Sequence, residues 1–296
     1  GTAITTGDNN VALGYEALQT ENTGSANVAI GYRALKTLDI GTTGYNTAVG
    51  MQAGLSVTTA LENTLIGALA GDAITSGNSN TAVGKSALGA ATTGTLNVAI
   101  GKDALRDNTT AGANTAVGTV SMRLNTTGAS NTAVGYGSLD TNTTGGSNVA
   151  IGRDSLTSNT TASNNTAVGY LSLTANTTGT QNTALGTFAL DANTTANYGT
   201  AVGYDALSGN TTGSENTTIG RQSLLANTTG SRNSALGSGA LSSNTTSSDN
   251  TGLGWAALFN TTTGANNTAV GSNALVANTT GADNVAVGSG ALASNT

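Results

Sequence analysis

A five-residue cassette, Asn-Thr-Ala-Val-Gly or a close variant, recurs along the whole 296-residue chain. Its closing glycines are 17 residues apart, except for a 19-residue interval between Gly31 and Gly50. A short period sustained over a whole chain is typical of solenoids and arrays, and not of a globular enzyme domain. The closing glycines, which number the coils from 1 to 17, are Gly14, Gly31, Gly50, Gly67, Gly84, Gly101, Gly118, Gly135, Gly152, Gly169, Gly186, Gly203, Gly220, Gly237, Gly254, Gly271 and Gly288.

The positions of a coil are counted from its closing glycine, which is position zero. Position −4 is Asn in 16 of 17 coils, the exception being Gly199, and position +3 is always Ala or Ser. Position +4 is Leu in 14 coils, with Met122, Gly54 and Gly71 in the others. Position −1 is Val, Ile or Leu in every coil, as in Val134, Ile151, Val168 and Leu185.

This pattern predicts two short strands and two turns in each coil. Positions −3 and −1 lie two residues apart, so their side chains leave one face of a strand, and the small residue at −2 faces the other way. In a second strand, positions +3 and +4 would likewise face opposite ways. The segment Asn-Thr-Thr-Gly, as at residues 142–145, predicts a turn. Frequent Gly, Thr and Asn disfavour helix.

We therefore expect an all-β fold, a parallel β-solenoid of 17 coils in which residues 1–296 form a single repeat solenoid. Identical residues then stack at the strand spacing, Val on Val and Leu on Leu. Each coil contributes only one branched aliphatic residue, one Leu and a few small residues, which makes a thin core. Of the two apolar stripes, one is expected to fill the coil interior and the other to form an interface between chains.

The cassette Asn-Val-Ala-Ile-Gly, at residues 27–31, 97–101 and 148–152 and followed three residues later by Ser or Ala, resembles the head repeat of trimeric autotransporter adhesins. It is similar also to repeats of trimeric bacteriophage tail fibres. The resemblance implies a left-handed β-roll in a homotrimer, with the cassette as the inner strand facing the trimer axis. It covers nearly the whole chain, although the family's repeats are usually shorter than 17 residues.

Composition excludes several kinds of function. The chain has no Cys, His or Pro, so disulfides, thiolate zinc sites and histidine-based triads are absent. A net charge of −6 is the wrong sign for a nucleic-acid partner, and no apolar run is long enough to insert into a membrane. The carboxylate pairs Asp103 with Asp107 and Asp140 with Asp154 follow no catalytic or calcium-binding pattern. We expect no catalytic residues, no metal and no cofactor.

The period is disturbed near the N-terminal end. The two extra residues lie between Leu35 and Asn46, and the next two coils carry Gly at position +4. Apolar residues appear later in these coils, at Leu38, Ile40, Val57 and Ile74. The favoured interpretation is degenerate repeats that repack the same core, since insertions in solenoids usually map to loops. The alternative is a bulged band that binds a ligand.

Position +1 carries most of the aromatic residues and is so variable that we expect it to face solvent. As a surface-binding stripe it would stack on sugars or contact a receptor; otherwise its rings cover neighbouring coils. No clustering of these residues is visible along the chain. The recurring Asn-Thr-Thr at Asn108, Asn125, Asn142 and Asn159 also matches a glycosylation sequon, although a turn and side-chain ladder explains its period better. The stripe consists of Tyr15, Tyr32, Tyr136, Tyr170, Tyr204 and Trp255.

The leading functional prediction is a non-enzymatic structural fibre segment. It would be a rigid spacer and attachment element of a homotrimeric phage tail fibre or bacterial surface adhesin, extracellular on a virion or cell. The alternative is direct binding of a cell-surface glycan, receptor or matrix. Ice binding is less favoured, because adjacent Thr residues in a strand point opposite ways. The chain begins and ends within a coil, so we expect either a longer protein or end-to-end assembly of subunits.

Overall fold

Each coil carries one β-strand, three residues long, at positions −3 to −1. The computed structural model describes residues 3–295, and within this range it contains no helix. The contacts divide the chain into two compact units, Gly1–Asn148 and Val149–Thr296, each of which is a parallel β-solenoid. The strands of the first unit are β1 (Val11–Leu13), β2 (Val28–Ile30), β3 (Thr47–Val49), β4 (Thr64–Ile66), β5 (Thr81–Val83), β6 (Val98–Ile100), β7 (Thr115–Val117) and β8 (Thr132–Val134).

The second unit repeats the same arrangement. Its strands are β9 (Val149–Ile151), β10 (Thr166–Val168), β11 (Thr183–Leu185), β12 (Thr200–Val202), β13 (Thr217–Ile219), β14 (Ser234–Leu236), β15 (Thr251–Leu253), β16 (Thr268–Val270) and β17 (Val285–Val287).

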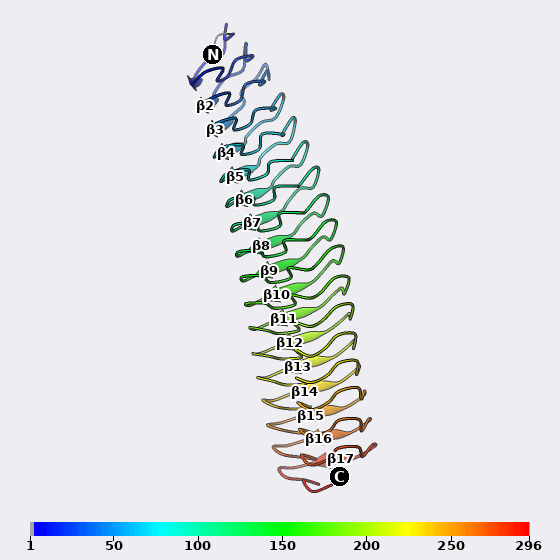
Figure 1. Ribbon diagram of the computed structural model, residues 1–296. Coiled ribbons are helices and arrows are strands. Elements are labelled where there is room, and N and C mark those ends of the chain that lie inside the picture. Colours follow the sequence, from blue (N-terminus) through cyan, green and yellow to red (C-terminus); the bar gives the residue numbers. More distant parts are fainter. Residues whose placement is uncertain (1–2, 296) are drawn as a thin grey trace. The chain divides into compact units, whose positions relative to one another are not determined.

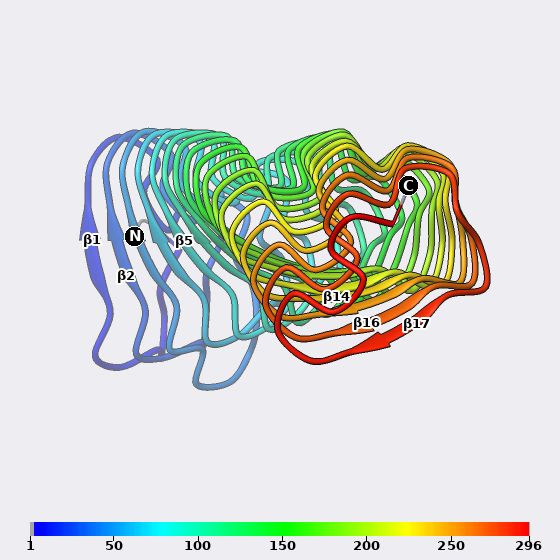
Figure 2. The same ribbon diagram turned by 90° about the horizontal axis from the view of Figure 1, so that it is seen from below.

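The strands within each unit pair in parallel and in strict register. Thr166 lies beside Thr183, Ala167 beside Ala184 and Val168 beside Leu185, so each position of a coil meets the same position of the next. Figure 1 shows this stacking within each unit, and Figure 2, seen from below, shows successive coils with similar outlines. The fixed repeat length therefore produces the ladder predicted from the sequence.

The strand faces alternate as predicted. The residue at −2, usually Ala, is buried inside the coil, whereas those at −3 and −1 face outward, as the buried Ala167 between Thr166 and Val168 illustrates. The core of each unit is therefore built from Ala at −2, Ala or Ser at +3, and Leu at +4. Of the two apolar stripes, Leu at +4 fills the interior and the aliphatic residue at −1 lies on the surface.

The second predicted strand is absent, and the prediction that positions +3 and +4 face opposite ways is wrong. Both are buried: Ala104 and Leu105 are each 0% exposed. The cause is left-handed backbone at +2 and +4, where Asp103 has φ 56° and Leu105 has φ 49°; this breaks the alternation of an extended chain. The Leu105 amide donates to the Ser121 carbonyl at 3.0 Å, so the distorted segment is still bonded to the next coil.

The closing glycine is required by both conformation and space. Gly84 has φ +135°, and a Cβ placed on it would lie 2.5 Å from the carbonyl oxygen of Gly101 in the next coil. No L-residue fits this combination of backbone angle and close approach. The glycine thus allows a close approach of successive coils at the end of each strand.

Two columns of buried asparagines connect the coils. At position −4, the Asn131 side chain donates to Gly145 O at 2.9 Å, and its Oδ1 accepts from the Asn148 backbone amide at 2.9 Å. At position +7, the Asn142 side chain donates to Asn125 Oδ1 at 2.7 Å and to Gly145 O at 2.9 Å. The first Asn of Asn-Thr-Thr therefore belongs to the core and does not lie on the outer surface of a turn.

The irregular band of the first unit has a repacked core, as the favoured interpretation predicted. Leu38, Val57 and Ile74 occupy the +7 column in place of Asn, and all three are 0% exposed. The bulge that contains the two extra residues lies over Glu21. The Ile40 amide donates to one oxygen of its carboxylate at 3.3 Å, and the Gly24 amide donates to the other at 2.6 Å. The bulge thus covers a buried carboxylate.

Candidate functional site

Several acidic residues of the chain form ion pairs along its surface. Asp103 lies 3.8 Å from Lys102, and Asp107 lies 2.7 Å from Arg106. Asp140 pairs with Arg123 at 3.0 Å and Asp154 with Arg153 at 3.1 Å, so the four carboxylates considered from the sequence each face a cation. Among residues 3–295, no group of three or more Asp and Glu side chains could hold a metal ion.

The pKa shifts of the carboxyl groups follow from these contacts. Hydrogen bonds from Lys36 and Arg33 lower the pKa of Glu16, and the hydrogen bond from Arg232 lowers that of Asp249. Burial raises the pKa of Asp140 despite its partner Arg123.

Asp191 differs from these groups because burial dominates its environment. Burial raises the pKa of Asp191 to about 6, although hydrogen bonds from backbone amides act in the opposite direction. One carboxylate oxygen of Asp191 is buried without a hydrogen-bond partner. Neither this group nor the ion pairs place a nucleophile, a base and an orienting group together.

The aromatic stripe at position +1 faces solvent in both units, as predicted. In the first unit Tyr15 and Tyr32 stack with ring centroids 5.8 Å apart and planes at 10°. Arg33 lies over the Tyr32 ring at 4.9 Å. All six residues of the predicted stripe are exposed, namely Tyr15, Tyr32, Tyr136, Tyr170, Tyr204 and Trp255.

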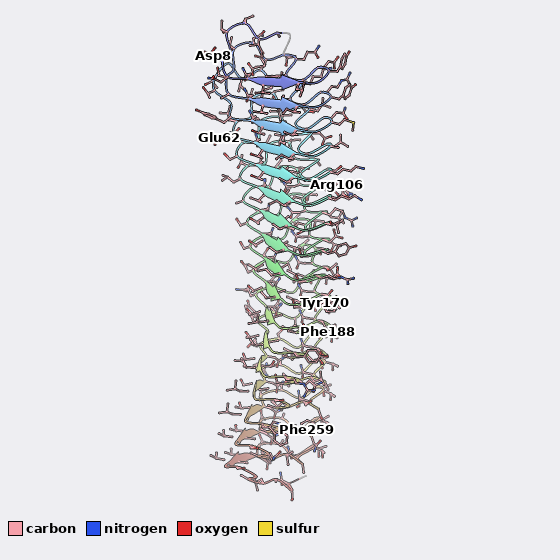
Figure 3. The ribbon with its side chains drawn as sticks, turned by 90° about the vertical axis from the view of Figure 1, so that its left-hand side faces the viewer. Asp8, Glu62, Arg106, Tyr170, Phe188 and Phe259 are labelled. Atoms are coloured by element: carbon pink, nitrogen blue, oxygen red, sulfur yellow. The ribbon has the colours of Figure 1, made fainter. Side chains whose placement is uncertain are left out.

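In the second unit the aromatic residues form a cluster, which is not visible along the sequence. Phe188, at position +2, makes edge contacts with Tyr170 at 5.6 Å and with Tyr204 at 6.2 Å, and thereby joins two members of the stripe. Phe188 is not among the predicted site residues because the predicted stripe comprises position +1 alone. A search across positions +1, +2 and +5 together finds both Phe188 and Phe259. Figure 3 shows Tyr170, Phe188 and Phe259 on the same side of this unit.

Further along this side, a hollow of about 360 Å³ opens between Arg221 and Trp255. At positions +1 and +2, the middle one of its three coils carries only the small residues Ser238 and Gly239. Phe259, at position +5 of the coil of β15, lies at its edge. The hollow thus combines two aromatic rings, one guanidinium and small polar side chains. Its lining residues are Arg221, Gln222, Leu225, Ser238, Gly239, Ser242, Trp255, Ala256 and Phe259.

A different surface runs along the outer face of the strands. The −1 side chains form an aliphatic row there. The most exposed members of this row in the interior coils range from 37% exposed for Val134 to 47% for Leu185. Over β13–β15 this face contains an apolar hollow of about 280 Å³, lined by Ile219, Leu236 and Leu253. This exposed apolar surface makes the strand face a candidate interaction surface.

The sequons and the threonine pairs have structural roles. Asn108, Asn125, Asn142 and Asn159 are all 0% exposed, so the folded chain presents none of these amides for a glycan. The two threonines that follow lie outside the strands, so the alternation expected of adjacent strand residues does not apply to them. The Thr109 hydroxyl donates to Thr126 O at 3.1 Å, and only the second threonine, such as Thr110, is exposed. The result is a single row of exposed threonines.

No family model matches the chain, and no characterised protein matches it significantly. Among residues 3–295 no helix is long and apolar enough to cross a membrane. The candidate functional surfaces are therefore the aliphatic strand face and the aromatic side of the second unit.

Proposed function

We propose that this chain is a structural fibre segment that assembles as a parallel, in-register homotrimer. It would serve as a rigid spacer and attachment element of a phage tail fibre or a bacterial surface adhesin. It needs no catalytic group and no cofactor for this role. The observation that carries the proposal is the row of aliphatic side chains at −1, which each unit leaves uncovered on the outer face of its strands.

A second copy of the chain is the partner that fits this surface best. The row repeats with the coil, at about 4.8 Å per coil, and only a partner with the same period can match it over many coils. Identical chains meet that condition. Closed rotational symmetry then buries every copy of the row without leaving an open surface. The similarity to trimeric adhesin and tail-fibre repeats favours three chains.

The thin core of one chain adds support. The apolar core of each regular coil is little more than an Ala at −2, a small residue at +3 and a Leu at +4. Burying the −1 side chain between chains adds a second apolar layer to each coil. A fibre segment also uses what repetition supplies, namely length, stiffness and many equivalent weak contacts.

Light scattering and sedimentation on the purified chain test the proposal. A trimer has a mass of three times 28.7 kDa. The variant Ile100→Asp/Val117→Asp/Val134→Asp places charges in the aliphatic row, where each unpaired buried charge costs several kcal/mol, and is expected to dissociate the trimer. The matched control Thr110→Asp/Thr127→Asp/Thr144→Asp adds the same charges on the exposed turns and is expected to remain trimeric. A stable monomer for the unaltered chain would overturn the proposal.

A second candidate function is direct binding of surface glycans. The aromatic cluster of the second unit favours it, because exposed rings beside polar groups are the usual platform for sugars. Glycan binding and fibre formation use different surfaces, the aromatic side and the strand face, so one chain can carry both. A glycan array probed with the intact chain tests this candidate; absence of any bound glycan would exclude it.

A further inference from the structure

We propose that the hollow between Arg221 and Trp255 binds a sugar that carries a carboxylate, such as a uronate or a sialate. The inference deepens the second candidate function, glycan binding, by naming a site and a ligand class. It does not depend on the trimer. The volume of about 360 Å³ lies in the range of small-ligand sites, at its lower end.

The hollow exists because one coil lacks side chains that its neighbours have. At positions +1 and +2 the coils of β13 and β15 carry Arg221 with Gln222 and Trp255 with Ala256, whereas the coil between them carries Ser238 and Gly239. Arg221 and Trp255 are therefore two coils apart, or roughly 10 Å. A Cβ on Gly239 would lie 3.3 Å from the Phe259 ring, so the glycine leaves the floor open beside that ring.

The walls of the hollow suit a sugar ring. Trp255 is 60% exposed and Phe259 is 38% exposed, although large aromatic side chains are normally well buried. The C–H face of a pyranose packs on such rings, while its hydroxyls need polar partners at the edge. Ser238, Ser242 and Gln222 line the same hollow and supply them.

Arg221 selects the charge of the ligand. Every other arginine in residues 3–295 forms an ion pair, whereas Arg221 forms none. Arg221 is exposed and lines the hollow, and a planar guanidinium binds a carboxylate through two parallel hydrogen bonds. A nucleic acid is a poor fit because the hollow offers a single cation and the chain carries a net charge of −6.

The site carries its own reporter, because Trp255 is the only tryptophan of the chain. Fluorescence titration of the intact chain uses 3′-sialyllactose and a glucuronate-containing hyaluronan tetrasaccharide as probes, and lactose as the neutral control. At least one acidic probe is expected to change the Trp255 emission and to bind about tenfold or more tightly than lactose. The probe that binds identifies whether the carboxylate comes from a sialate or a uronate.

Two variants test the residues of the hollow. Arg221→Gln removes the charge and is expected to abolish the preference for acidic probes. Gly239→Leu fills the floor and is expected to weaken binding at least tenfold. Position +2 tolerates large side chains with positive φ, since Phe188 has φ 57°, so the fold should survive. Gly290→Leu, at the same position with φ +68°, is the matched control and should bind normally.

The outcomes distinguish a failure of the hollow as the binding site from a failure of glycan binding itself. If neither acidic probe binds in preference to lactose, or if Gly239→Leu binds as well as the control, the assignment of this hollow is wrong. If binding instead disappears in Phe188→Ala, measured by calorimetry, while the hollow variants bind normally, the glycan surface lies at the aromatic cluster and glycan binding itself stands. Sedimentation of each variant shows separately whether the variant still forms a trimer.

Discussion

Leu65 occupies the core space that Gly71 leaves empty. Leu65 stands at position −2 of its coil, where Ala is usual, and Gly71 stands at +4, where Leu is usual. A Cβ placed on Gly71 would lie 2.7 Å from Leu65 Cδ2, and one placed on Gly54 would lie 2.8 Å from Leu65 Cδ1. The large side chain has thus moved from one position to the other, and two glycines make room for it.

This relationship predicts strong coupling between the two positions. Leu65→Ala is expected to cost about 2–5 kcal/mol because it leaves a cavity beside two glycines. Gly71→Leu alone is expected to destabilise by overpacking. The double variant restores the Ala and Leu arrangement of regular coils, and Gly71 already has the φ of 56° that Leu adopts at +4. Thermal unfolding and hydrogen exchange of this coil should show the double variant more stable than either single one; simple additivity would contradict the relationship.

Thr218 supplies a second test of the core. It also stands at −2, and its buried hydroxyl has no hydrogen-bond partner. Thr218→Val keeps the shape and removes the unsatisfied group, so we expect a gain of about 1–2 kcal/mol in the free energy of unfolding. The neighbouring Thr217 faces outward, and Thr217→Val should change stability by less than about 0.5 kcal/mol. Equal effects at the two positions would show that the hydroxyl of Thr218 costs nothing.

Asp191 predicts a pH dependence of stability. Its pKa is raised from 3.8 to about 6 in the folded chain, with burial as the main cause and Asp205 adding repulsion. The folded state therefore holds a proton that the unfolded state releases, and the resulting stabilisation, complete below pH 3.8, is lost as the pH rises to about 6.

Asp191→Asn should remove this dependence. Because Asp191 is only partly buried, the gain at pH 7 should be about 1–2 kcal/mol after screening by water. Melting temperatures from pH 3.5 to 8 measure it. Parallel profiles for the variant and the parent chain would rule out Asp191 as the titrating group.

The asparagine column at −4 predicts a large local loss of stability when one of its members is removed. Asn131→Ala leaves the Asn148 amide without its side-chain partner and removes one of the two side-chain bonds to the Gly145 carbonyl, which keeps that from Asn142, at about 2–4 kcal/mol in total. Ser130→Ala, one residue earlier and exposed, should change stability by less than about 0.5 kcal/mol. Hydrogen exchange at Asn148 is the direct measurement, and unchanged protection there would argue against the ladder.

Much of the fold is evident in the sequence because the repeat has a fixed length. A constant spacing of 17 residues puts identical positions beside one another, and this alone predicts parallel, in-register strands such as β10 and β11. Alternation in Thr-Ala-Val correctly predicts that Ala167 is inside and Val168 outside. The variability of position +1 correctly predicts that its aromatic residues are exposed, and the lack of His and Cys is read directly from the sequence.

Only the tertiary structure decides how the rest of the coil turns. Residues such as Leu105 and Val120 rarely take positive φ, so no local rule predicts that they do so here. Their conformation is imposed by neighbouring coils, through bonds such as that of the Leu105 amide to Ser121 O and through burial of the Leu side chain. The same packing brings Asn108 into the core, joins Phe188 to two tyrosines and leaves Gly239 as the floor of a hollow. These contacts join different positions of adjacent coils, which a column-by-column pattern does not contain.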